Sequence, residues 1–242
     1  MKRRTFLFGT GLLAAGGAYA AHTLPAYRLQ TGLQLVSKAL AGPSTPPTEA
    51  TSKSFALPNA WAGQLIEAAE SQIGVTVVYD PAYVSLPFPN GDLPRERGVC
   101  TDVVVRAYRD AFGYDLQSAV NADMKSDFSS YPKIWGLKRP DRNIDHRRVP
   151  NLQTFFRRKG AALPVTANAK DYQPGDVVSQ MLPGNLPHMA IVSHRASADS
   201  ERPMVVHNIG AGTQLEDRLF DFEITGHYRF KPACRSRAEV CL

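Results

Sequence analysis

The sequence has 242 residues, of which 43% are hydrophobic and 21% are charged, and its formal net charge is +6. Three of the positive charges lie at positions 2–4, so a chain without its leader is closer to +3. This composition excludes a disordered chain, and it argues against nucleic acid as a partner because such proteins rely on a strongly basic surface. One globular domain is expected, since no motif recurs at a period of about 20 to 50 residues.

Residues 1–20 have the features of a secretory signal peptide. Basic residues at 2–4 precede an uncharged apolar run that ends in the small-residue exit Ala18-Tyr19-Ala20. We expect cleavage near Ala21 and a periplasmic protein. The basic pair at positions 3 and 4 resembles a twin-arginine signal, although ordinary Sec leaders also begin with basic residues. The apolar run is shorter than the roughly 20 residues of a membrane-spanning helix, so no stable membrane insertion is expected after cleavage.

Residues 21–54 are polar and rich in proline, which predicts a flexible linker before a domain at 55–233 and a tail at 234–242. Asn59 is a suitable N-cap for a helix that ends before Gly74. A strand is predicted at 75–79. Several prolines then indicate a long loop up to Cys100.

A second amphipathic helix is predicted to begin at Cys100 and to end at Gly113. Its apolar positions follow helical spacing, whereas Arg106, Arg109 and Asp110 lie on the other side. Further helices are predicted at 116–124 and 150–159. Alternating patterns at 176–181, 188–194, 203–208 and 225–230 predict strands. Helices followed by a meander of strands indicate an α+β fold with an antiparallel sheet.

Cys100 is the candidate nucleophile. The first turn of a helix favours an anion, so this position is expected to lower the pKa of a thiol. Asp102 would oppose the thiolate if it pointed at the sulfur, and a nearby imidazole is therefore required. The alternative is that Cys100 is simply a small buried residue.

His188 and His207 are the candidate partners of this thiol. His188 opens a strand and shares the side of Ala190 and Val192, which we expect to be buried. Symmetric closure of the following hairpin pairs position 188 with 207 or 209, and both registers put His207 on the face of His188. A slip of one residue would present Asn208 instead. A nucleophile, a base and a group that orients the base are the requirements of thiol acyl transfer.

These residues resemble two bacterial protein groups. The order of Cys100, a Pro-Gly-Asp turn at 174–176, His188 and His207 resembles the NlpC-type cysteine peptidases and amidases of cell walls. Four longer strings, at 97–102, 143–152, 182–188 and 226–228, resemble an uncharacterised bacterial family typified by YijF. The resemblance implies a papain-like fold in which Cys100 is the nucleophile, His188 the base and His207 the orienting residue. It also implies that the Cys100 amide lies in the oxyanion hole.

Residues 138–159 hold eight basic and two acidic side chains. If this segment lines the cleft, Arg147 or Arg148 would bind carboxylates of a murein peptide, with Asn208 a further candidate for substrate contact. A solvated basic face is the alternative. A metal site of two histidines and a carboxylate is a rival, but His188 and His194 lie about 20 Å apart on one strand and cannot share an ion.

We therefore expect an exported cysteine hydrolase that cleaves an amide bond, within peptidoglycan peptides, through Cys100, His188 and His207. No cofactor and no metal are expected. The alternative is a non-catalytic module that binds cell wall or protein. Cys234 and Cys241 are predicted to form a disulfide in the oxidising periplasm, which would leave Cys100 reduced.

Overall fold

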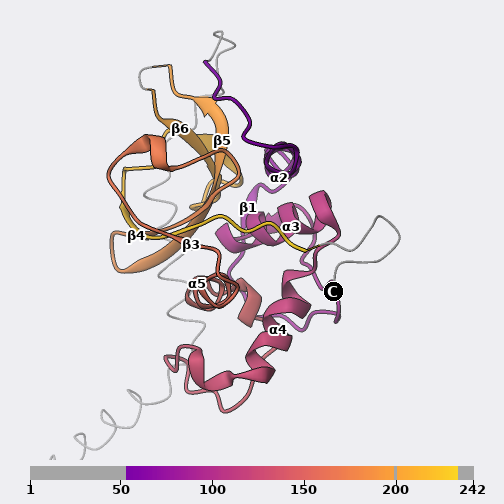
Figure 1. The fold of residues 1–242 in the computed structure, drawn as a ribbon. Helices are drawn as coiled ribbons and strands as arrows, with labels where there is room; N and C mark the ends of the chain where they lie inside the picture. The colour runs from indigo at the N-terminus through magenta and orange to yellow at the C-terminus, as the bar shows by residue number, and fades with distance from the viewer. Residues whose placement is uncertain (1–52, 199–200, 234–242) are drawn as a thin grey trace, which may run out of the picture.

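The computed structural model describes residues 53–198 and 201–233. The predicted leader, most of the predicted linker and the predicted disulfide between Cys234 and Cys241 lie outside these residues. Within them, helices cover one face of an antiparallel sheet and precede most of its strands in the sequence (Figure 1). The mixed α+β class predicted from the sequence is confirmed.

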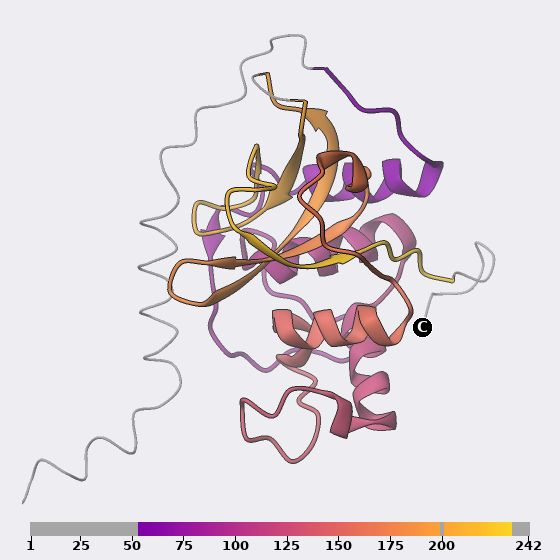
Figure 2. The same cartoon turned by 60° about the vertical axis from the view of Figure 1, so that its left-hand side comes forward.

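The helical layer has four α-helices in the described chain. They are α2 (Ala60–Glu70), α3 (Cys100–Phe112), α4 (Leu116–Ser126) and α5 (Val149–Arg158). The side chain of Asn59 caps α2 by accepting the N–H of Ala62 at 3.0 Å, as predicted. Gly113 ends α3 at a φ of 64°, a left-handed conformation that glycine adopts without a steric penalty. Helices α2, α3 and α5 lie one above another beside the sheet (Figure 2).

The main sheet of the described residues has the strand order β3-β8-β4-β5-β6-β7. The strands are β3 (Ala162–Leu163), β4 (Val177–Leu182), β5 (Leu186–Ala196), β6 (Pro203–His207), β7 (Gln214–Glu216) and β8 (Glu223–Tyr228). Four of these match the predicted strands with shifted ends, whereas the short strands β3 and β7 escaped prediction. Three 3-10 turns lie outside the sheet, namely η1 (Phe128–Ser130), η2 (Asp145–Arg147) and η3 (Ala169–Asp171).

The strand predicted at 75–79 is mostly irregular. Only Val78–Tyr79 forms a strand, β1, which pairs in parallel with β2 (Arg97–Gly98). Val75 and Val77 are exposed instead of packing on a sheet neighbour. The prediction was correct for the last two residues and wrong about the length of the strand, because alternation alone cannot show whether a neighbouring strand exists.

Both faces of β5 are buried. Ala190 and Val192 pack with β4, β6 and the loops on one face, which confirms that their side is buried. Met189 and Ile191 point to the other face and pack against the helices, including α3. The helix that begins at Cys100 therefore covers the face opposite to the one that His188 shares with Ala190.

The long loop before Cys100 is held by Arg106 of α3. We expected Arg106 on the solvent side of the helix, but its side chain is fully buried. It donates to the Asp92 carboxylate at 2.9 Å and to the backbone oxygens of Leu93 and Arg97 at 3.3 and 2.8 Å. A guanidinium has five N–H donors, which suits it to a loop whose carbonyl groups have no strand partner. This contact positions the backbone that leads into α3.

None of the helices in residues 53–198 and 201–233 has both the length and the apolar character needed to span a membrane.

Candidate functional site

Cys100 is the first residue of α3, and its side chain is buried, with 5% of the residue exposed. The turn is held by Asp102, whose Oδ2 atom accepts the backbone N–H of Val99 at 2.7 Å. Gly98 fits closely against this turn, since a Cβ atom there would lie 3.1 Å from the Asp102 side chain and from Arg106. The backbone before Cys100 and the helix turn after it are therefore both held in place.

Asp102 does not stand as an unbalanced charge beside the thiol. Arg147 binds its carboxylate through Nε at 2.9 Å and Nη2 at 3.0 Å, and both side chains are almost fully buried. The same guanidinium donates to the backbone oxygens of Ala82 and Asp80 at 3.0 and 2.8 Å. Every nitrogen of Arg147 thus has a partner within the fold. Arg147, which the sequence predicted to bind substrate carboxylates, binds the Asp102 carboxylate within the fold, and substrate binding by Arg147 stays a prediction.

The start of α3 lies against the sheet near the point where β5 and β6 stop pairing. These strands pair at Val192↔Val205 and at Ile191↔Val206, and β6 ends at His207. Beyond this point Cys100 packs in one cluster with Met189, whose backbone amide acts to lower the pKa of the thiol. The thiol therefore meets β5 at the residue next to His188.

Asn208 holds the same opening from the other strand. Its amide donates to the backbone oxygen of Gly98 at 3.1 Å and accepts the N–H of Gly210 at 3.0 Å. The residue is fully buried. Asn208 thus holds the segment before Cys100 in place, and its predicted contact to substrate stays a prediction.

The structure pairs His188 with His207. Nε2 of His188 lies 3.1 Å from Nδ1 of His207, and the two rings are inclined at 75°. Continuing the β5–β6 register places His207 opposite Ala190, so it reaches His188 along the diagonal. Both imidazoles are buried. Of the two adjacent candidates, His207 faces the His188 ring and Asn208 faces the Cys100 loop.

The series of side-chain hydrogen bonds continues beyond His207. Its Nε2 atom lies 3.0 Å from Oε2 of Glu216 on β7, and the same oxygen accepts from Nε of Arg218 at 3.0 Å. Burial alone would raise the pKa of Glu216, but the hydrogen bond from His207 and the charge and hydrogen bond of Arg218 outweigh it and hold that pKa below its usual value. Glu216 is therefore an ionised acceptor at the far end of the chain.

The Cys100 thiol and the His188 imidazole are both neutral in this environment. Burial raises the pKa of the Cys100 thiol to about 12, although the amides of Met189, Thr101 and Cys100 itself act in the opposite direction. Burial is the main cause that lowers the pKa of His188 well below its usual value, and the charge of Arg218 acts in the same direction. The expected reduction of the thiol pKa is therefore wrong: removal of water from the sulfur outweighs the amides at the helix start.

The basic segment at 138–159 does not form one charged surface. Arg148 pairs with Asp145 at 2.9 Å and lies over the Trp135 ring at 4.2 Å from its centroid. Arg158 and Lys159 both bind Asp123. Several basic side chains of this segment are therefore paired with carboxylates of the fold. The segment as a whole does not line one cleft.

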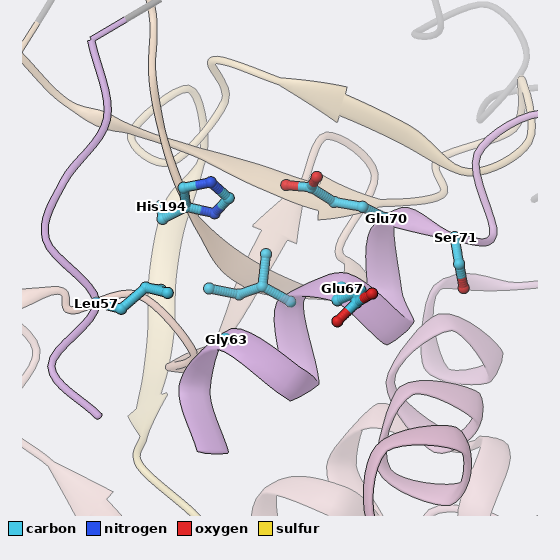
Figure 3. A pocket seen from close by; sticks show the side chains of 7 residues that line it. Leu57, Gly63, Glu67, Glu70, Ser71 and His194 are labelled. Carbon is cyan, nitrogen blue, oxygen red and sulfur yellow. The ribbon is translucent and has the colours of Figure 1, made fainter. Parts of the chain in front are cut away.

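A hollow in the surface lies at the other end of β5. It is bounded by the segment before α2, by α2 itself and by His194 (Figure 3). Its lining is Leu57, Gly63, Ile66, Glu67, Glu70, Ser71 and His194. His194 is six residues from His188 along the strand, about 20 Å away, so the hollow and the imidazole pair are separate places. No group of three metal-binding side chains occurs among residues 53–198 and 201–233.

Comparison with known proteins places this chain in a family. Residues 66–230 match the model described as Domain of unknown function (DUF1287). The chain belongs to the DUF1287 family. It is 52% identical over 166 residues to "Uncharacterized protein YijF" of Escherichia coli (strain K12), an alignment that covers 69% of this chain and 80% of that protein. No solved structure matches. All the residues of the thiol–imidazole arrangement lie within the DUF1287 match.

Glu216 is the member of this hydrogen-bonded group that the sequence did not indicate. It lies on a strand of three residues, which is too short for an alternating pattern to reveal. The sequence does place Glu216 and Arg218 at alternate positions after a glycine-rich turn. This spacing points to His207 only when β7 is known to pair with β6, which places Gln214 opposite His207.

Proposed function

We propose that this protein is a thiol hydrolase that cleaves an amide bond, with Cys100 as nucleophile, His188 as base and His207 as the residue that orients the base. The observation that carries the proposal is the meeting of the Cys100 sulfur with β5 next to His188, whose ring is already hydrogen-bonded to His207. Together with the motif order, this supports a relationship to the NlpC-type, papain-like enzymes.

Because the Cys100 thiol and the His188 imidazole are both neutral, the reaction requires a proton transfer from the thiol to the imidazole. His188 accepts the Cys100 proton as the sulfur attacks the amide carbon, so the S–H bond breaks while an N–H bond and a C–S bond form. The N–H groups at the start of α3 are positioned to stabilise the oxygen that becomes negative. His188 then returns the proton to the leaving amine. Water attacks the resulting thioester, with His188 again taking a proton, and the acid product and the free thiol are released.

Peptide amides of peptidoglycan are the substrate class we propose. The support is the resemblance to cell-wall amidases and a leader sequence that predicts export. Arg147 is bound to the buried Asp102 carboxylate, so it is not the group we propose for substrate recognition. Substrate selection therefore depends on other groups around the opening between β5 and β6.

Defined muropeptides incubated with purified protein test this function, with products read by mass spectrometry. We expect a mass change that corresponds to hydrolysis of one amide. Cys100→Ala and His188→Ala should abolish it while circular dichroism stays unchanged. Arg218→Lys is not a suitable control because it touches the imidazole chain, whereas Glu223→Gln on the exposed end of β8 should retain full turnover. Cleavage that persists in Cys100→Ala would overturn the proposal.

A non-catalytic binding module is the second candidate, and the burial of a protonated Cys100 favours it. The dependence of thiol alkylation on His188 separates the two functions. In a hydrolase, His188→Ala slows alkylation of Cys100 because the base that accepts its proton is lost. In a binding module, the same substitution leaves the alkylation rate unchanged or raises it by opening the site.

A further inference from the structure

We infer that Glu216 is a positioning residue that sets the proton positions on both histidines, so that Nδ1 of His188 is unprotonated. The functional meaning of this inference rests on the proposed hydrolase, but the proton positions themselves do not. The inference starts from one contact, between Oε2 of Glu216 and Nε2 of His207 at 3.0 Å.

An ionised carboxylate only accepts hydrogen bonds. Nε2 of His207 must therefore carry a proton. Arg218 donates to the same carboxylate oxygen at 3.0 Å and so helps to hold Glu216 in place. A His207 ring whose one proton is on Nε2 has a bare Nδ1 atom, which is an acceptor.

The second contact transmits this choice to His188. Nδ1 of His207 lies 3.1 Å from Nε2 of His188, and an acceptor at His207 requires a proton on Nε2 of His188. Burial lowers the pKa of His188 and keeps this ring neutral. Its single proton is therefore on Nε2, and Nδ1 keeps its lone pair. A base for the thiol needs that lone pair.

A second proton on His207 would give the opposite result. If His207 carried two protons, its Nδ1 would donate to Nε2 of His188, and the His188 proton would move to Nδ1. His188 would then present a donor and could not accept the thiol proton. The pair of Glu216 and Arg218 thus selects the orientation of the whole hydrogen-bonded chain from a place that does not touch Cys100.

Nitrogen-15 spectra of histidine-labelled full-length protein at neutral pH test this inference directly, because two-bond proton couplings distinguish a protonated ring nitrogen from a bare one. The six histidines are assigned by single substitutions. We expect protonated Nε2 and bare Nδ1 on both His188 and His207. A wild-type spectrum with Nδ1 of His188 protonated would overturn the inference.

Two substitutions of Glu216 and one control complete the test. Glu216→Leu removes the acceptor, so both rings should populate the other tautomer and alkylation of Cys100 should fall by roughly tenfold or more. Glu216→Gln keeps an oxygen acceptor and should restore most of the wild-type pattern. Asp221→Asn, which removes the other carboxylate near Arg218, should leave both imidazoles unchanged.

The outcomes separate this inference from the proposed function. Unchanged tautomers in folded Glu216→Leu contradict the role of Glu216, whatever the protein hydrolyses. The expected tautomers in a protein that cleaves no amide leave the proton positions intact and reject the hydrolase. If Glu216→Leu does not fold, the wild-type spectrum and the Glu216→Gln spectrum still decide the matter.

Discussion

Replacement of Arg147 by methionine separates a structural role from substrate binding. Arg147 makes two contacts to the buried Asp102 carboxylate and two to backbone oxygens, and its side chain is 2% exposed. Methionine fills much of the same volume but leaves Asp102 with the Val99 N–H and no counter-charge. Removing one partner of a buried ion pair costs about 3–5 kcal/mol, because the remaining charge stays out of water.

This loss should be visible in thermal unfolding. A chain of this size loses about 2–4 °C for each kcal/mol, so the midpoint of Arg147→Met should fall by about 6–20 °C. Arg148→Met is the matched control, since Arg148 is more exposed and has one carboxylate partner and one aromatic ring. Its loss should be about 1–2 kcal/mol.

A double-mutant cycle with Asp102→Asn isolates the pair itself. The amide oxygen of asparagine still accepts the Val99 N–H, so the cap survives while the charge is removed. The two losses should not add, because each variant already removes the same interaction. An Arg147→Met protein of unchanged stability with weakened substrate binding would refute this reasoning and restore Arg147 as a substrate ligand.

The other predictions concern the thiol, the two candidate orienting residues and the first helix. Because burial raises the pKa of Cys100 to about 12, its alkylation rate should increase about tenfold per pH unit from about pH 7 to pH 10; a plateau below about pH 8 would contradict a buried neutral thiol. His207→Ala should reduce single-turnover hydrolysis, or Cys100 alkylation if no substrate is found, more strongly than Asn208→Ala, and the reverse order would identify Asn208 as the third residue. Asn208→Ala should instead lower stability by about 1 kcal/mol in urea unfolding, through loss of the bond to Gly98. Asn59→Ala should cost about 1 kcal/mol and Asn59→Asp much less, because only the latter retains a capping oxygen; equal losses would show that this cap contributes nothing.

Local sequence patterns were sufficient to predict much of the fold. Helical spacing after Cys100 and the glycine at 113 predicted α3 to within one residue, because both signals act through neighbouring turns of the same helix. Period-two alternation placed His188 and His207 on one face of the sheet, and this follows from strand geometry whatever the protein around it. The same argument could not choose between two hairpin registers, since both satisfied the alternation.

What only the tertiary structure decided is the environment of these residues. Arg147 reads as a surface charge in its basic segment, and the distant Asp102 makes it a buried structural cation. The thiol pKa depends on how much water the sheet and the helices exclude, which no local spacing encodes. Glu216 joins the histidines only because β7 pairs with β6. Contacts between segments far apart in the sequence set charge, burial and proton position, whereas the sequence by itself determined which helices and strands would carry them.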